Sequence, residues 1–97
     1  MLNKVLKIDF RKNKKKKMIH VYFEIDNKHY GCVEIDKKLT IKDLKAVIGA
    51  YMVKNYNLDI IFNIYDYSLY YSYLEYKNRD KIEDTFINNE SSVILFS

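Results

Sequence analysis

Apolar and polar residues alternate along two neighbouring segments near the start of the chain. Residues 19–26 place an apolar side chain at every second position, and residues 33–36 repeat the alternation after the turn-forming sequence Asp26-Asn27-Lys28. Successive side chains of a strand point to opposite faces. The pattern therefore predicts a β-hairpin with one buried and one exposed face. Gly31, inside the second strand, indicates a bulge or a close backbone approach.

A helical pattern follows the hairpin. Thr40 is a favourable N-cap, and Asp43 three residues later resembles the acidic partner of a capping box. Apolar residues then recur at helical spacing at Ile41, Leu44, Ile48, Tyr51 and Met52. This predicts an amphipathic helix of about fourteen residues whose apolar face covers the hairpin. The lysines interspersed in this pattern are expected to face solvent: Lys42, Lys45 and Lys54.

The second half of the chain is rich in tyrosine. The sequence DIIFNI, residues 59–64, predicts a third strand, and VILF, residues 93–96, predicts the last one. Between them, residues 65–76 carry six of the ten tyrosines. Tyrosine clusters on strands commonly form a half-buried face with solvated hydroxyls. The alternative is an exposed aromatic contact surface.

Two segments resemble a known family. TIKDLKAVI, residues 40–48, looks like the start of the main helix of ubiquitin-like proteins, and KIEDTFINNESSVILF, residues 81–96, is similar to the closing half of ubiquitin. The resemblance implies an α+β, ubiquitin-like β-grasp fold (ββαββ) in which a mixed sheet of four to five strands packs on one helix. The core predicted for such a fold is Val21, Phe23, Val33, Ile35, Leu44, Ile48, Ile60, Ile82, Ile87, Val93 and Leu95.

The resemblance divides the chain into two parts. Residues 18–97 correspond to the ubiquitin-like domain, with a tyrosine-rich insertion at residues 63–80. Residues 1–17 form a basic N-terminal arm in which residues 5–10 could add an edge strand. The arm has eight basic residues against one acidic residue, whereas residues 18–97 have nine basic and twelve acidic ones, so their net charges are +7 and −3. The basic character of the protein therefore belongs to the arm.

The resemblance also suggests a contact surface. Aligned with ubiquitin, Ile61, Ile94 and Phe96 fall on its apolar binding patch, and alternation places them opposite the core residues Ile60, Val93 and Leu95. An exposed apolar cluster commonly marks a contact site. In the alternative, the insertion or residues 6–10 cover this cluster. The predicted protein-binding residues, with three tyrosines of the insertion added, are Ile61, Ile94, Phe96, Tyr70, Tyr71 and Tyr73.

Catalytic and metal-binding chemistry has little support. One cysteine and two histidines give no metal-ligand spacing, and the two glycines are isolated, so there is no phosphate-binding loop. Cys32 with a histidine would lack an orienting group and an oxyanion hole. We therefore expect no enzymatic activity and no cofactor. The lone cysteine and the lack of a signal-like or membrane-spanning apolar run predict an intracellular protein, cytoplasmic or nuclear, without a membrane partner.

Three functional hypotheses remain. The leading one is a non-catalytic, noncovalent protein-interaction module, with partners in the ubiquitin pathway or, because a spliceosomal branch of the family also lacks Gly-Gly, in the spliceosome. The second is a conjugated modifier, which requires a natural C-terminus that extends beyond Ser97 to Gly-Gly. The third is a nucleic-acid-associated protein whose arm contacts phosphates in a salt-dependent manner. The arm residues predicted for this role are Lys14, Lys15, Lys16 and Lys17.

Overall fold

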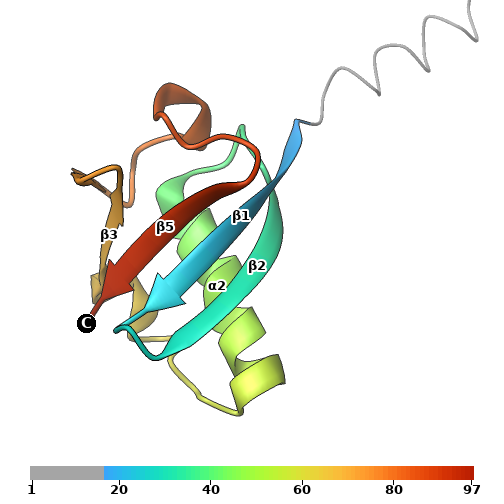
Figure 1. Cartoon of the computed structure of the whole chain (residues 1–97), viewed down its shortest axis with the longest axis vertical. Coiled ribbons are helices and arrows are strands. Elements are labelled where there is room, and N and C mark those ends of the chain that lie inside the picture. The colour runs from blue at the N-terminus through green and yellow to red at the C-terminus, as the bar shows by residue number, and fades with distance from the viewer. Residues whose placement is uncertain (1–16) are drawn as a thin grey trace, which may run out of the picture.

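The computed structural model describes residues 17–97 (Figure 1). Lys14, Lys15 and Lys16, and the strand suggested for residues 5–10, lie outside the described residues. The strands and the helix are, in order, β1 (Met18–Ile25), β2 (His29–Asp36), α2 (Ile41–Tyr56), β3 (Ser68–Tyr71), β4 (Leu74–Tyr76) and β5 (Ser91–Phe96). Two short 3₁₀ helices, η1 (Ile64–Asp66) and η2 (Ile82–Asp84), lie in the connections.

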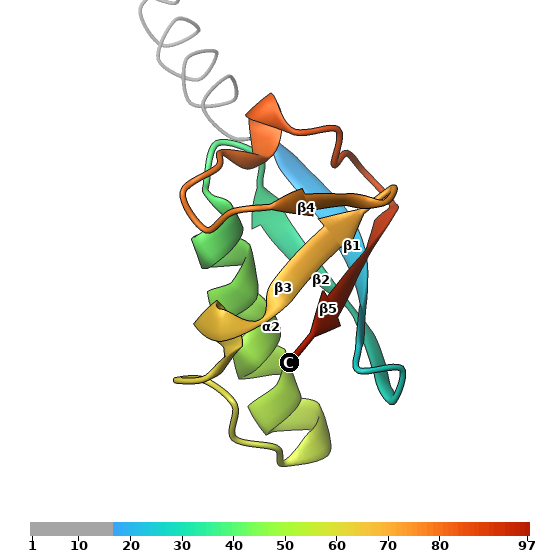
Figure 2. The same cartoon turned by 90° about the vertical axis from the view of Figure 1, so that its left-hand side faces the viewer.

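The strands form one mixed sheet in the order β2-β1-β5-β3-β4. The last strand, β5, lies in the middle, parallel to β1 and antiparallel to β3. The helix α2 crosses one face of this sheet, as the two views show (Figures 1 and 2). The predicted α+β architecture, a sheet of four to five strands on one helix, is confirmed with five strands.

The first hairpin follows its sequence pattern. Every second residue of β1 from Ile19 to Ile25 is buried, and β1 pairs with β2 without interruption. Asp26 and Asn27 adopt left-handed backbone conformations, with φ of 49° and 59°. Two such residues form the type I′ turn that matches the twist of paired strands, and aspartate and asparagine tolerate this conformation well. The predicted hairpin and its turn are confirmed.

Both ends of α2 are capped by side chains or by a change in backbone conformation. The Thr40 hydroxyl accepts a hydrogen bond from the Asp43 amide, and the Asp43 carboxylate accepts one from the Thr40 amide at 3.0 Å. This is the capping box expected from the sequence. At the other end, Asn57 turns left-handed with φ of 53°, and the amide of Leu58 donates to the carbonyl of Met52. The helix is 16 residues long, close to the expected length.

The sheet and the helix share one hydrophobic core. All eleven residues predicted for it are buried. The core also contains residues that the prediction did not include: Ile19, Ile25, Ile41, Met52, Ile64 and Leu69. Of these, Ile41 and Met52 lie on the predicted apolar stripe of the helix, and Ile19 and Ile25 on the predicted inner face of β1. The period-two and period-3.6 patterns therefore identified nearly all of the helix and hairpin residues in the core.

The prediction of a third strand at residues 59–64 is wrong. This segment forms a turn and the start of η1, in which the amide of Ile64 donates to the carbonyl of Ile60 at 2.8 Å. Ile60 and Ile64, four residues apart, are buried, whereas Phe62 between them is 85% exposed. In a strand, residues 60, 62 and 64 would share one face, so an exposed side chain between two buried ones is typical of a helical turn. The third strand is instead Ser68–Tyr71, so β3 and β4 belong to the tyrosine-rich segment.

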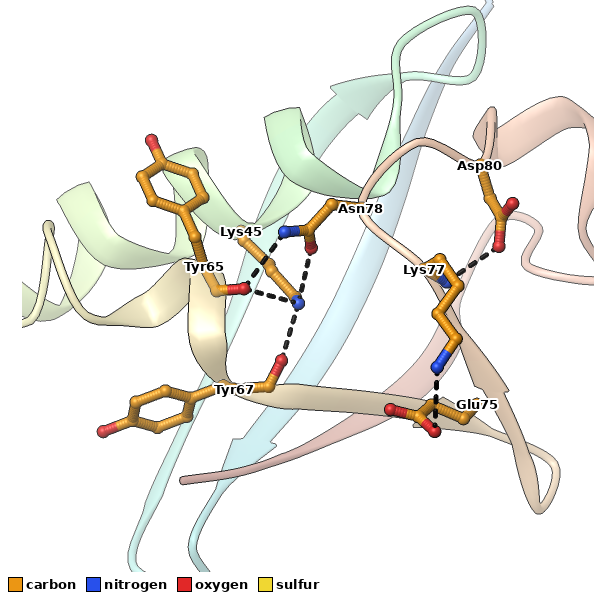
Figure 3. A network of polar contacts seen from close by, with 7 residues as sticks. All are labelled: Lys45, Tyr65, Tyr67, Glu75, Lys77, Asn78 and Asp80. Carbon is orange, nitrogen blue, oxygen red and sulfur yellow. Dashed lines mark hydrogen bonds and ion pairs between the residues drawn. The ribbon is translucent and has the colours of Figure 1, made fainter.

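Lys45 links the helix to that segment, contrary to the prediction that it faces solvent. Only 3% of the residue is exposed. Its ammonium donates hydrogen bonds to the carbonyl of Tyr67 at 2.6 Å and to the side-chain oxygen of Asn78 at 2.7 Å, with the carbonyl of Tyr65 at 3.4 Å (Figure 3). Tyr67 precedes β3 and Asn78 follows β4. One side chain of α2 thus holds both ends of the second hairpin.

Burial lowers the pKa of Lys45 below its ordinary value of 10.5, although the nearby carboxylates of Glu75 and Asp66 act to raise it. The unfolded chain therefore keeps this proton to a higher pH than the native protein does. Stability rises with pH wherever the unfolded state binds more protons. The contribution of Lys45 to the free energy of unfolding thus increases as pH rises through the interval below 10.5.

We expect Lys45→Met to lower the free energy of unfolding by about 2 kcal/mol, because the oxygens of Tyr67 and Asn78 lose their buried donor. Lys54→Met, at an exposed position of the same helix, should change it by less than about 0.5 kcal/mol. Urea denaturation measures both. As pH rises toward 10.5, the native protein should gain stability relative to Lys45→Met, because its lysine loses the proton before that of the unfolded chain does. Equal stability of the two variants would contradict the structural role of the buried ammonium.

Gly31 leaves room for two aromatic rings. Its pairing with Phe23 is in register, so no bulge occurs there. A Cβ atom at this position would lie 2.5 Å from the Tyr51 ring and 2.6 Å from the Phe23 ring. These two rings pack edge to face, with centroids 5.2 Å apart. The groups that approach Gly31 closely are therefore side-chain rings, where the sequence predicted a bulge or a close backbone approach.

The two glycines of the chain should respond oppositely to replacement by alanine. Gly31→Ala should lower the free energy of unfolding by about 1–3 kcal/mol, because the added methyl group overlaps two packed rings. Gly49→Ala should raise it by up to about 1 kcal/mol, because that residue lies inside α2 and a Cβ there meets its nearest neighbours at ordinary distances of 3.5–3.8 Å. Thermal unfolding of both variants tests the pair, and stabilisation by Gly31→Ala would contradict this packing.

Candidate protein-interaction surface

The face of the sheet opposite α2 carries a row of paired residues from four strands. Glu24 of β1 pairs with Ile94 of β5, Ile94 pairs with Tyr70 of β3, and Tyr70 pairs with Glu75 of β4. Paired residues point to the same side of a sheet. Within residues 17–97, α2 packs on the other side, and β5 and β1 face the viewer in Figure 1 with the helix behind them. The centre of this row is therefore apolar, with Ile94 exposed and Tyr70 half-buried.

A groove runs along this face beside the second hairpin. It has a cavity volume of about 510 Å³ and is lined by Tyr70, Ser72, Tyr73, Ser92, Ile94 and Phe96. We call it the β5 groove. The rings of Tyr70 and Phe96 meet at a centroid distance of 6.2 Å and an angle of 67°. Ile94 is 37% exposed and Phe96 is 40% exposed. Exposed apolar side chains thus converge on one concave site.

The tip of the second hairpin overhangs this groove in a strained conformation. Ser72 and Tyr73 connect β3 to β4, and both have positive φ angles, of 53° and 68°. A type I′ turn requires these angles, but it strongly favours asparagine and glycine. For other residues the left-handed conformation costs roughly 1–2 kcal/mol each. The Tyr73 side chain is fully exposed. The hairpin therefore presents a tyrosine to solvent where glycine would fit the backbone better.

Four of the six predicted contact residues meet in the β5 groove: Tyr70, Tyr73, Ile94 and Phe96. The other two do not. Ile61 lies near Gly49 of α2, with its Cα atom 3.6 Å from where a Cβ of that glycine would be. It is therefore not on the sheet face, and Tyr70 occupies the position beside Ile94 that the alignment gave to Ile61. Tyr71 is half-buried and packs against the hydrophobic core.

Sequence reasoning missed the two serines that line the groove, Ser72 and Ser92. Ser92 could have been found from alternation, because it precedes the inward-facing Val93. Ser72 could not, because its place depends on the hairpin turn, and the usual signal of asparagine followed by glycine is absent there. The last predicted arm residue, Lys17, is exposed, and its carbonyl accepts a hydrogen bond from the amide of Lys37.

Charged groups on the sheet face are mostly acidic. The Glu75 carboxylate lies 3.4 Å from the Lys77 ammonium, and Glu34 lies 3.7 Å from the His20 ring. Asp26 accepts a hydrogen bond from the Ser97 amide at 2.9 Å, at the end of β5. Burial raises the pKa of Tyr67, and the charge of Asp26 raises it further. Asp26 is thus close enough to the start of β3 to act on it electrostatically.

Metal-binding clusters and membrane-spanning helices are absent from the described part of the chain. No three histidine, cysteine, aspartate or glutamate side chains among residues 17–97 gather so as to hold a metal ion. In the same range, no helix combines the length and apolar character needed to cross a membrane. Cys32 is half-buried in β2 and carries a free thiol.

Comparison with known proteins identifies the fold. No protein-family model matches the sequence, and neither does any curated protein. Among solved structures, the ubiquitin-like domain of the Arabidopsis thaliana protein At2g32350 superposes with a TM-score of 0.63 at 24% identity, covering 84% of this chain and 79% of that one. A structure described as "Molecular Mimicry of SUMO promotes DNA repair" gives 0.62 at 19% identity, covering 81% of this chain and 90% of the other.

A third similar structure is that of ATBAG1 in complex with HSP70, with a TM-score of 0.63 at 16% identity. The match covers 79% of this chain but only 38% of that one, so this chain spans well under half of its length. These similarities agree with the strand order, the single covering helix and the closing segment described above. The protein therefore has the ubiquitin-like β-grasp fold.

Proposed function

We propose that the protein is a noncovalent protein-interaction module that binds partners through the β5 groove. The observation that carries the proposal is the convergence of Tyr70, Ile94 and Phe96 on a concave part of the sheet face that α2 leaves uncovered. Clustered apolar side chains on a monomer surface commonly mark a contact site. Tyrosine is also among the residues that contribute most to binding energy at interfaces.

The magnitude of the hydrophobic effect is consistent with this role. Burying an apolar side chain contributes about 1.5–3 kcal/mol when it is fully removed from water. Ile94 and Phe96 already have more than half of their surface covered, so each would contribute only part of that amount. Tyr73 is fully exposed and has the most surface to gain. Micromolar affinity, about 8 kcal/mol, would therefore require the hairpin tip together with the strands.

The similar structures support this class of function. ATBAG1 was solved in complex with HSP70, and mimicry of SUMO is described as promoting DNA repair. Both descriptions concern those proteins, and both belong to molecules with this fold. By analogy, we infer that this chain also acts by binding other proteins. Partners of the ubiquitin pathway or the spliceosome, conjugation to targets, and nucleic-acid contacts of the arm stay predictions.

The proposal can be tested with matched surface variants. Tyr70→Ala combined with Ile94→Ala should abolish most partner binding, because it removes the centre of the groove. Phe62→Ala combined with Phe86→Ala is the control, since these rings are 85% and 74% exposed and are not among the groove-lining residues. Affinity purification from cells that express the protein, followed by quantitative mass spectrometry, compares the two. Partners retained by the groove variant but lost by the control would contradict the proposal.

The hairpin tip should show a trade-off between stability and binding. Tyr73→Gly should raise the free energy of unfolding by up to about 1 kcal/mol, because glycine adopts the left-handed conformation without strain. The same change should weaken partner binding, because it removes the most exposed ring of the groove. Chemical denaturation and a binding titration with one captured partner measure both effects. Unchanged affinity in a stabilised variant would exclude Tyr73 from the interface.

A further inference from the structure

Carboxylates surround the apolar centre of the β5 groove. Glu24 is the neighbour of Ile94 on β1, and Glu75 is the neighbour of Tyr70 on β4. Asp26 lies at the end of the groove that Phe96 forms, where it accepts hydrogen bonds from the Ser97 amide and hydroxyl. An acidic group therefore lies on each of two flanks and at one end. Residues 18–97 as a whole carry a net charge of −3, which strengthens the local negative potential.

Basic groups do not balance these carboxylates. Lys77 lies 3.4 Å from Glu75 and offsets its charge in part, with both side chains well exposed. Exposed ion pairs of this kind contribute little stabilising free energy, and their side chains exchange partners readily. His20 of β1 lies beside Glu34 of β2, and β2 is separated from the groove by β1. Glu24 has no ion pair among the residues that the structure describes, so its charge on the β1 flank of Ile94 is uncompensated.

The two flanking glutamates have a fixed separation. They lie on β1 and β4, with β5 and β3 between them, which makes three strand spacings. Neighbouring strands are roughly 4.8 Å apart, so the two positions are separated by about 14 Å. An extended peptide advances about 3.3 Å per residue and presents every second side chain to the same side. Residues i and i+4 of such a peptide therefore span this distance, with residue i+2 between them on the same face.

We propose that the β5 groove recognises a basic partner segment in which an apolar residue stands between two lysines or arginines, laid across the strands in extended conformation. This inference rests on the proposed function and specifies its partner. The apolar residue packs on Ile94, Tyr70 and Phe96. The two cations reach Glu24 and Glu75. Charge complementarity of this kind selects partners and register more than it adds affinity.

The test is a selection of random twelve-residue peptides displayed on phage against the full-length protein at low salt. Enriched sequences should carry lysine or arginine at i and i+4 around an apolar or aromatic residue. A synthetic peptide of the enriched sequence should shift the backbone amide resonances of Ile94 and Tyr70. Its affinity should fall about tenfold for Glu24→Lys combined with Glu75→Lys. Glu83→Lys combined with Asp84→Lys, which changes the same charge on exposed residues of η2, should leave it nearly unchanged.

Selection against the Glu24→Lys, Glu75→Lys protein should reverse the preference toward peptides with acidic flanks. Two kinds of failure can be told apart. Peptides that lose binding with Tyr70→Ala and Ile94→Ala but show no basic flanks overturn this inference and leave the proposed function standing. Peptides that bind equally well to that variant, or no enriched peptides at all, overturn both.

The chain itself also supplies a basic segment, residues 1–16, which includes apolar residues. Salt can be added to the protein without any peptide while the groove resonances are recorded. If these resonances shift, the groove is already occupied by this segment. That result would overturn the proposal that a separate partner occupies the groove. Dilution then shows which molecule supplies the segment, because resonance shifts that depend on protein concentration require the segment of a second copy. Shifts independent of concentration indicate the chain's own segment.

Discussion

A single helix has to cover a five-stranded sheet, and this constraint shapes the rest of the described structure. Every inward-facing residue of the strands must reach α2 or the short 3₁₀ helices, so the core is one contiguous cluster around Leu44 and Ile48. The opposite face has no second layer among residues 17–97. Side chains there do not contribute to the core, and their chemistry is therefore free to serve binding. The β5 groove follows from this asymmetry between the two faces.

Much of the fold could be predicted because its strongest signals are local. The alternation of β1, the turn at Asp26, and the capping box of Thr40 and Asp43 each depend on residues within one element. The third strand could not be predicted in the same way. Ser68–Tyr71 is four residues long, and half-buried tyrosines on both of its faces remove the contrast on which alternation depends. The more apolar sequence around Ile60 therefore gave the stronger strand signal, and it predicts the third strand there.

The candidate site was predicted only in part, for a related reason. The positions of Ile94 and Phe96 follow from the alternation of β5. Which tyrosine stands beside them depends on the register between β3 and β5, a long-range property that no local pattern reports. The observed third strand begins nine residues later than the predicted one. Ile61 therefore lies on the helix side, and Tyr70 takes the expected position on the sheet face. Lys45 was misjudged because its partners are mainly backbone carbonyls, which leave no trace in the sequence.

The enclosed ammonium of Lys45 also distinguishes it from the other lysines of the folded domain. Amine-reactive reagents need direct access to the nitrogen atom, and the side chain is almost completely covered. The remaining lysines from Lys17 to Lys81 are exposed or only half covered. Brief acylation of the native protein would thus spare one position, and its modification would mark molecules whose second hairpin has detached from the helix. Acylation of Lys45 would therefore measure how often the second hairpin separates from α2.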